Sequence, residues 1–172
     1  MLLEQMSHAT VAGVEWNRRA DNCDRACLAR CSGVILRAMS RENVEVVRRA
    51  YEAWNRRDFN EAVELLAPDI EWQMPPNLPD AETWRSSAEV TRRLETFLES
   101  WTELRVEVHE LIDAGDRVVA LVRYSGQAAL TGLAVEGAGV DAAVWTLRDG
   151  KATKVQMYGG TDEALAAVGL RQ

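Results

Sequence analysis

The sequence is poor in the residues that build metal centres, nucleic-acid surfaces and membrane spans. Its 172 residues include only two histidines and three cysteines, and 20 Lys and Arg stand against 27 Asp and Glu, which gives a net charge of −7. A nucleic-acid surface requires a clustered basic footprint, so this charge balance argues against nucleic acid as a partner. No apolar stretch approaches the ~18–20 residues that a membrane-spanning helix requires.

All three cysteines, Cys23, Cys27 and Cys31, follow one another at four-residue spacing. On a helix this spacing would align their thiolates on one face, where they could bind a soft metal. No histidine or fourth cysteine lies nearby, and the paired spacing of zinc sites is absent. We therefore expect no metal and a reduced, weakly ordered segment. His109 alternates with apolar residues, which predicts a solvated side chain rather than a catalytic one.

The N-terminal 39 residues differ from the remainder of the chain. Their apolar residues follow no sustained period, and the start of the chain lacks the basic residues and continuous apolar core of a secretory signal peptide. We expect residues 1–39 to form a poorly ordered extension of a cytoplasmic protein, and residues 40–172 to form one domain. Ser40 is predicted to cap the first helix, and Met39 is an alternative start of translation.

Three segments of the domain have the apolar spacing of amphipathic helices. The stripe of the first consists of Val44, Val47, Tyr51 and Trp54. The second helix begins at Phe59, and Pro68 is expected to end it. The third opens with a capping box, in which Glu89 follows Ser86 by three positions. A short C-terminal helix is expected from Thr161.

Alternating apolar and polar residues predict strands between and after these helices. A short strand is expected at residues 70–74, and long strands at residues 104–110, 117–125, 140–147 and 152–158. Asp-Ala-Gly-Asp at 113–116 and Asp-Gly at 149–150 join the long strands in pairs, and such reversals are strong hairpin signals. We therefore predict an α+β fold, a cone-shaped α+β barrel with N-terminal helices packed into a strongly curved antiparallel sheet.

Four segments of the domain together resemble a known superfamily. They are VEVVRRAYEAWNRRDFNEAVELLAPDIEW at 44–72, LIDAGDRVVALVRYSG at 111–126, VWTLRDGKATKVQMY at 144–158 and DEALAAVGL at 162–170. With these segments in this order, the chain is similar to the nuclear transport factor 2-like superfamily, and within it to SnoaL-like or ketosteroid isomerase-like proteins. The resemblance covers about three quarters of the chain.

The resemblance implies a bent sheet around helices, an apolar pocket open at one end, and a homodimer formed through the outer sheet face. It is specific for the fold but not for a reaction, because this fold hosts cyclases, isomerases, hydrolases and non-catalytic modules. The catalytic carboxylates and tyrosine of ketosteroid isomerases fall at Met74, Ala143 and Ala50. Steroid isomerisation by the known mechanism is therefore not expected. Tyr51 cannot simply replace the tyrosine, because one residue along a helix rotates a side chain by ~100°.

One carboxylate could still support acid/base chemistry in the pocket. In the strand at 140–147, Asp141 shares a face with Ala143, Trp145 and Leu147. A carboxylate on such an apolar face has a raised pKa and can exchange a proton with a ligand, so Asp141 is the candidate catalytic acid/base. The alternative is that Asp141 lies at the open rim of the cone or pairs with a cation such as Arg123.

Aromatic residues are the candidate substrate-binding groups. Those expected to point inward are Tyr51, Trp54, Trp72, Trp101, Trp145 and Tyr158. They could form the walls of a site for a flat, apolar molecule, or they could be ordinary core. In a cone these two interpretations are compatible, since core and pocket wall are continuous.

Two functional hypotheses remain open. In the first, the protein is a cofactor-free isomerase, cyclase or hydrolase in which Asp141 transfers a proton on a small apolar or aromatic molecule. In the second, the same pocket holds such a molecule without turning it over, and a third, weaker option is a dimerisation module with a filled core. None of the three requires a metal, a cofactor or a membrane.

Overall fold

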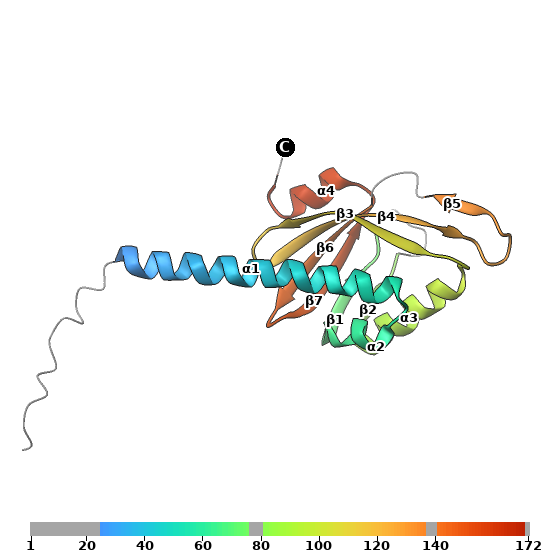
Figure 1. The fold of residues 1–172 in the computed structure, drawn as a ribbon, viewed down its shortest axis with the longest axis horizontal. Helices are drawn as coiled ribbons and strands as arrows, with labels where there is room; N and C mark the ends of the chain where they lie inside the picture. The colour runs from blue at the N-terminus through green and yellow to red at the C-terminus, as the bar shows by residue number, and fades with distance from the viewer. Residues whose placement is uncertain (1–24, 76–80, 137–140, 171–172) are drawn as a thin grey trace, which may run out of the picture.

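The computed structural model describes residues 25–75, 81–136 and 141–170, and its helices pack against a curled sheet (Figure 1). The elements are α1 Arg25–Asn55, α2 Phe59–Glu64, β1 Leu66–Gln73, β2 Thr83–Arg85, α3 Ser87–Glu99, β3 Arg105–Asp113, β4 Arg117–Gln127, β5 Ala134–Glu136, β6 Asp141–Arg148, β7 Lys151–Tyr158 and α4 Thr161–Ala167. The strand order is β2-β1-β7-β6-β4-β3, and β5 pairs with β4. This arrangement confirms the predicted α+β cone.

The long hairpins form where the alternating pattern predicted them. β3 pairs with β4, β4 with β6 and β6 with β7, all antiparallel. At the β6–β7 reversal, Asp149 and Gly150 both adopt positive φ, 52° and 72°, which a tight hairpin turn requires. The sheet differs from the prediction in one pair: β1 lies parallel to β7, so the sheet is mixed.

The sheet buries both of its faces, but against different elements. α1, α2 and α3 lie on the concave side, where Val47 and Ile70 belong to the main core and are fully buried. α4 covers part of the convex side, and there Ala142 and Val144 pack with Ala164 and Leu165 of α4. Successive residues of a strand point to opposite faces, so β6 supplies both cores by alternation.

The first helix is longer than expected, and the predicted cap at Ser40 is wrong. α1 begins at Arg25 and runs for 31 residues, and in Figure 1 its N-terminal part extends beyond the sheet. The buried side chains of Ser40 and Asn43 have a tertiary role instead. The Ser40 hydroxyl donates to the Asp113 carboxylate, and the Asn43 amide donates to the Gly115 carbonyl at 3.0 Å. Both bonds attach α1 to the turn between β3 and β4.

The predicted extension lies partly outside the described residues. Cys23 falls there, whereas Cys27 and Cys31 belong to the backbone of α1. A domain boundary after residue 39 stays a prediction. In the described part of the chain, no group of three His, Cys, Asp or Glu side chains could hold a metal ion. None of the helices described is long and apolar enough to cross a membrane.

Two further local predictions have mixed outcomes. The second helix ends at Glu64, before Pro68, and Pro68 lies inside β1 where the register with β7 is irregular. Such an irregularity tolerates a residue that has no N–H to donate. The capping role of Ser86 is confirmed, because its side chain accepts a hydrogen bond from the Glu89 N–H. The Glu89 carboxylate accepts from the Arg85 N–H, one residue before the cap.

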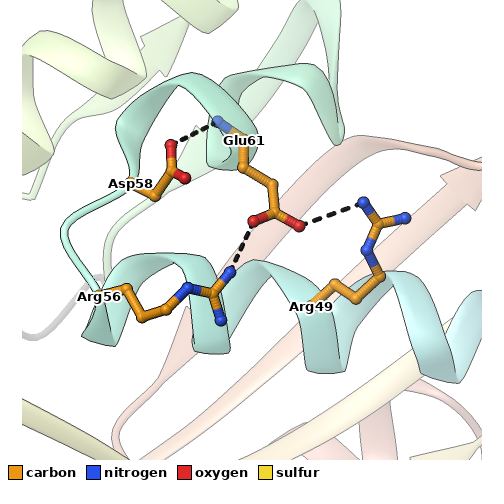
Figure 2. A network of polar contacts seen from close by, with 4 residues as sticks. All are labelled: Arg49, Arg56, Asp58 and Glu61. Atoms are coloured by element: carbon orange, nitrogen blue, oxygen red, sulfur yellow. Dashed lines mark hydrogen bonds and ion pairs between the residues drawn. The ribbon is translucent and has the colours of Figure 1, made fainter.

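A polar network joins α1 to α2 beside the cone (Figure 2). The Glu61 carboxylate forms ion pairs with two arginines of α1, with N–O distances of 3.2 Å to Arg49 and 2.6 Å to Arg56. Asp58 caps α2 by accepting a hydrogen bond from the Glu61 N–H at 3.1 Å. The network lies at the surface, so it orients the short α2 more than it stabilises the fold.

Candidate functional site

A cavity of about 450 Å³ opens at one end of the cone. Its volume falls within the range of about 300–1,000 Å³ that is usual for small-molecule sites. Its apolar wall comes from α1, β1, β2, α3 and β7 and includes Trp54, Trp72, Trp84, Leu94, Phe97 and Met157. The polar side chains that line it are Tyr124, Asp141 and Tyr158.

Three tryptophans form one side of the cavity. Trp72 and Trp84 are direct partners across β1 and β2, and their rings stack with centroids 6.4 Å apart. Trp54, from the last turn of α1, meets Trp72 edge-on at 6.0 Å. The indole N–H groups of all three are buried without a hydrogen-bond acceptor among the described residues. A buried donor that no acceptor reaches costs about 1–3 kcal/mol.

Asp141 lies where the alternation of its strand predicted. It is the first residue of β6, and Ala143, Trp145 and Leu147 of the same face belong to the inner core. Asp141 is half-buried and lines the cavity, and desolvation by this burial raises the pKa of its carboxyl group. Among the cavity-lining residues that the structure describes, it is the only one with a carboxylate.

Of the two alternatives for Asp141, a position at the open rim and an ion pair with a cation such as Arg123, the ion pair does not form. Across the β4–β6 ladder Asp141 is paired with Val122, whose side chain is buried in the inner core. Arg123 is the next residue along β4 and is exposed, so it points to the opposite face. No other basic side chain in the described ranges forms an ion pair with Asp141. The carboxylate therefore faces the cavity without a counter-charge.

Tyr124 is a cavity residue that the sequence interpretation missed. It follows Val118, Ala120 and Val122 on the inner face of β4, and it lines the cavity close to Asp141. Burial raises the pKa of Tyr124 well above its usual value, and the neighbouring ionisable groups of Tyr51 and Asp141 raise it further. The alternation in RVVALVRYS was sufficient to place Tyr124 on the apolar face. Trp84 was also missed, because its three-residue strand is too short for a periodic signal.

Of the six predicted binding aromatics, Trp54, Trp72 and Tyr158 line the cavity, whereas Tyr51 and Trp145 lie behind its wall. Both are buried, and the Trp145 indole N–H donates to the Tyr51 hydroxyl at 3.2 Å. Burial raises the pKa of Tyr51, and the bond to Trp145 opposes this only in part. Trp145 also meets Trp72 edge-on at 5.6 Å, so these two residues support the wall rather than form it.

Trp101 has other surroundings than expected, and Tyr158 lines the cavity but also has a second set of contacts. Trp101 follows α3, is not among the cavity-lining residues, and packs against Phe97 with ring centroids 5.9 Å apart. Tyr158 lies at the cavity margin, at the end of β7, and it packs with the outer core under α4. Its neighbour Met157 points inward instead, because β7 alternates between the two faces.

The sequence profile of the SnoaL-like domain family matches residues 47–155. The chain belongs to this family. A comparison with curated proteins finds no match.

Solved structures agree with the family assignment. A nuclear transport factor 2-like protein of Burkholderia thailandensis E264 is 32% identical, with a TM-score of 0.61, over 76% of this chain and 98% of that one. A nuclear transport factor 2-like protein of unknown function from Burkholderia pseudomallei K96243 is 26% identical, with a TM-score of 0.62, over 74% and 97%. TerC, co-crystallised with polyporic acid, is 25% identical, with a TM-score of 0.61, over 75% and 97%.

Asp141 does not occupy either of the positions that the resemblance to ketosteroid isomerases implies for their acidic residues. The resemblance to ketosteroid isomerases places their acidic residues at Met74 and Ala143, and here Met74 lines the cavity while Ala143 is buried in the inner core. Asp141 lies on the same face of the same strand as Ala143, two residues earlier. Two residues along a strand span about 6.5–7 Å, and Asp141 is half-buried whereas Ala143 is buried, so the carboxyl group of this chain lies nearer to solvent than Ala143 does.

Proposed function

We propose that this SnoaL-like protein binds a small, flat, apolar molecule in the cavity and isomerises or cyclises it by acid/base catalysis, with Asp141 as the catalytic group. The observation that carries the proposal is the half-buried carboxyl of Asp141 in a wall that is otherwise aromatic and aliphatic. A carboxylate in such surroundings is a stronger base than a solvated one, because burial raises its pKa.

The chemistry is proton transfer beside a carbonyl group. The Asp141 carboxylate removes a proton from the carbon next to the carbonyl, and the electron pair of the broken C–H bond moves to the oxygen. In an isomerisation, the protonated Asp141 returns its proton to another carbon of the same molecule. In a cyclisation, the enolate carbon attacks an internal carbonyl carbon, the electron pair of the broken C=O π bond moves to that oxygen, and the oxygen takes up the proton from Asp141. No oxidant, reductant or second substrate is required.

The alternative function is binding without turnover. One observation favours it: at the two positions where ketosteroid isomerases carry acids, this chain has Met74 and Ala143. A cavity with a single carboxylate can hold an apolar ligand without any reaction. The two functions predict the same ligand class but differ in the effect of removing the Asp141 charge.

The first experiment identifies a ligand through the tryptophans. Flat aromatic ketones, steroids, polyketides and polyporic acid are titrated while tryptophan fluorescence and thermal unfolding are measured, since Trp54, Trp72 and Trp84 contact the cavity. A ligand at ~100 times its dissociation constant stabilises the protein by about 2.7 kcal/mol. If no compound of the panel binds, the proposed ligand class is wrong.

The second experiment separates catalysis from binding. Asp141→Asn keeps the size of the side chain and removes its base, so an enzyme loses turnover of the identified ligand and keeps its affinity. Asp69→Asn is the matched control, because Asp69 is an exposed residue of β1 that does not line the cavity. Full turnover in Asp141→Asn excludes Asp141 as the catalytic group, and absence of turnover in the wild type supports the binding function.

The homodimer and the cytoplasmic location belong to the same proposal. The homodimer is supported by the family resemblance, which implies pairing through the outer sheet face. Light scattering on the purified full chain measures its mass in solution, and a monomer at micromolar concentration would contradict this part of the proposal.

A further inference from the structure

Tyr124 and Asp141 project into the same corner of the cavity from neighbouring strands. Asp141 is directly opposite Val122 in the β4–β6 ladder, and Tyr124 lies two residues beyond Val122 on the same face. Tyr124 and Asp141 are therefore diagonal neighbours, whose Cα atoms lie about 7–8 Å apart in an antiparallel pair and within reach of an aromatic side chain. Both side chains line the cavity.

The hydroxyl group of Tyr124 is available to a ligand. No residue in the described ranges hydrogen-bonds to it, and it is not among the polar atoms that are sealed away from solvent. Tyr51 is the contrasting case, because it is buried in the core and its hydroxyl already accepts the Trp145 N–H. Burial and the Asp141 charge raise the Tyr124 pKa, so its phenol stays protonated near neutral pH and remains a donor.

Few other side chains of the described cavity wall could hydrogen-bond to a polar group of a ligand. Apart from Tyr124 and Asp141, the only polar side chain among the described lining residues that is not a tryptophan is Tyr158, which packs at the margin with the outer core. The indole N–H groups of Trp54, Trp72 and Trp84 are sealed from solvent. Among the described lining residues, the phenol of Tyr124 thus lies beside the carboxyl group of Asp141, in largely apolar surroundings.

We propose that Tyr124 is the specificity-determining residue of this cavity. Its hydroxyl donates a hydrogen bond to a carbonyl oxygen of a flat, apolar ligand and so selects ligands that carry such an oxygen. The same bond places the carbon next to that carbonyl at the Asp141 carboxyl. This inference rests on the proposed function and narrows its substrate class to apolar ketones and related carbonyl compounds.

A matched pair of probes tests the selection directly. 9-Fluorenone and fluorene share one flat skeleton and differ in a single carbonyl oxygen, and the binding of each is measured by quenching of tryptophan fluorescence. We expect wild-type protein to bind fluorenone more tightly, and Tyr124→Phe to weaken fluorenone binding about tenfold, the effect of a hydrogen bond near the upper end of its usual range. Fluorene binding should not change.

Control variants separate hydrogen bonding from packing. Thr96→Val removes an exposed hydroxyl of α3 that does not line the cavity, and it should leave both affinities unchanged. In the infrared spectrum, the carbonyl stretch of bound fluorenone should lie at lower frequency in wild type than in Tyr124→Phe, a shift that a structural defect does not produce. Equal losses for both probes in Tyr124→Phe, an unchanged preference for fluorenone, or no binding of either probe to the wild type overturns the proposal.

Selection of carbonyl ligands by Tyr124 and catalysis by Asp141 can fail independently of each other. Fluorenone has no hydrogen on the carbon beside its carbonyl, so its binding does not depend on turnover. If Tyr124→Phe loses the carbonyl preference while Asp141→Asn keeps turnover of a reactive ketone, the selection stands and acid/base catalysis by Asp141 fails. If Asp141→Asn abolishes turnover while Tyr124→Phe keeps the preference, the selection fails and the catalytic role stands.

Discussion

Replacing Tyr51 by Phe should destabilise the fold while leaving the cavity wall in place. Tyr51 is 2% exposed and Trp145 is also 2% exposed, and the bond between the Trp145 indole N–H and the Tyr51 hydroxyl measures 3.2 Å. Phe retains the ring that meets Trp145 edge-on at 5.5 Å, so aromatic packing is preserved. The variant therefore removes one hydrogen bond and leaves one buried donor without an acceptor.

The expected loss follows from the asymmetry of buried hydrogen bonds. A bond between two neutral groups contributes about 0.5–1.5 kcal/mol, but a buried N–H left without an acceptor costs about 1–3 kcal/mol. The three other buried indoles of this wall already lack acceptors among the described residues, so repacking offers Trp145 little relief. We expect a loss of about 2 kcal/mol in the free energy of unfolding. In a chain of this length that loss lowers the melting temperature by about 4–8 °C.

Urea denaturation followed by tryptophan fluorescence measures this loss, with thermal unfolding as a second measurement. Tyr124→Phe is the matched control, because no described residue hydrogen-bonds to the Tyr124 hydroxyl, and its stability should change by less than about 0.5 kcal/mol. The affinity for an apolar probe such as fluorene should change in neither variant. A loss below about 0.5 kcal/mol for Tyr51→Phe, or an equal loss for both, refutes the assignment of Tyr51 to the supporting layer and Tyr124 to the cavity.

Two further predictions concern charge and anchoring. The pKa of Asp141 is higher in the folded than in the unfolded protein, so the folded state binds this proton more tightly. The protonated carboxyl group therefore stabilises the fold fully below the unfolded pKa of about 3.9, and this stabilisation is lost as the pH rises through the folded pKa. Asp141→Asn should therefore be more stable than wild type at pH 7 and equally stable at acidic pH. The gain at pH 7 should be less than about 1 kcal/mol, because the carboxyl group is partly solvated. Urea denaturation measures it, and a variant less stable than wild type at pH 7 would contradict this expectation. The Asn55 side chain donates to the Val106 carbonyl at 2.8 Å and accepts from the Val106 N–H at 2.9 Å, joining the end of α1 to β3. Asn55→Ala should cost about 2–3 kcal/mol in the same assay, because it leaves two partly buried backbone groups unpaired, and a cost under 1 kcal/mol means that water replaces the amide.

Several features of the fold could be predicted because they depend on neighbours in the sequence. The period-two alternation of the long strands and the Asp149-Gly150 turn specify hairpins locally, and the structure contains them. The same alternation placed Asp141 on the inner face of β6, which is confirmed. Ser86 caps α3 as its spacing to Glu89 predicted.

Other features depend on contacts between residues that are far apart in the sequence. The hydroxyl of Ser40 is a suitable helix cap by local criteria, but its partner is Asp113, which is 73 positions away. Pro68 ends a helix in isolation, whereas here an irregular ladder with β7 accommodates it in a strand. Trp101 is an aromatic residue of the kind that lines pockets, yet it packs beside α3. Tyr158 lines the cavity and also packs with the outer core under α4.

The local sequence pattern is sufficient to predict the long strands, their inner and outer faces and hence the direction in which Asp141 points, since side-chain alternation is a property of a single strand. It did not determine which strands become neighbours. The pairing of β4 with β6 decided that Tyr124 lies beside Asp141, and the pairing of β1 with β2 decided that Trp84 completes the aromatic wall. Contacts between distant segments depend on sheet curvature and register, which no local pattern encodes, and the candidate site consists of such contacts.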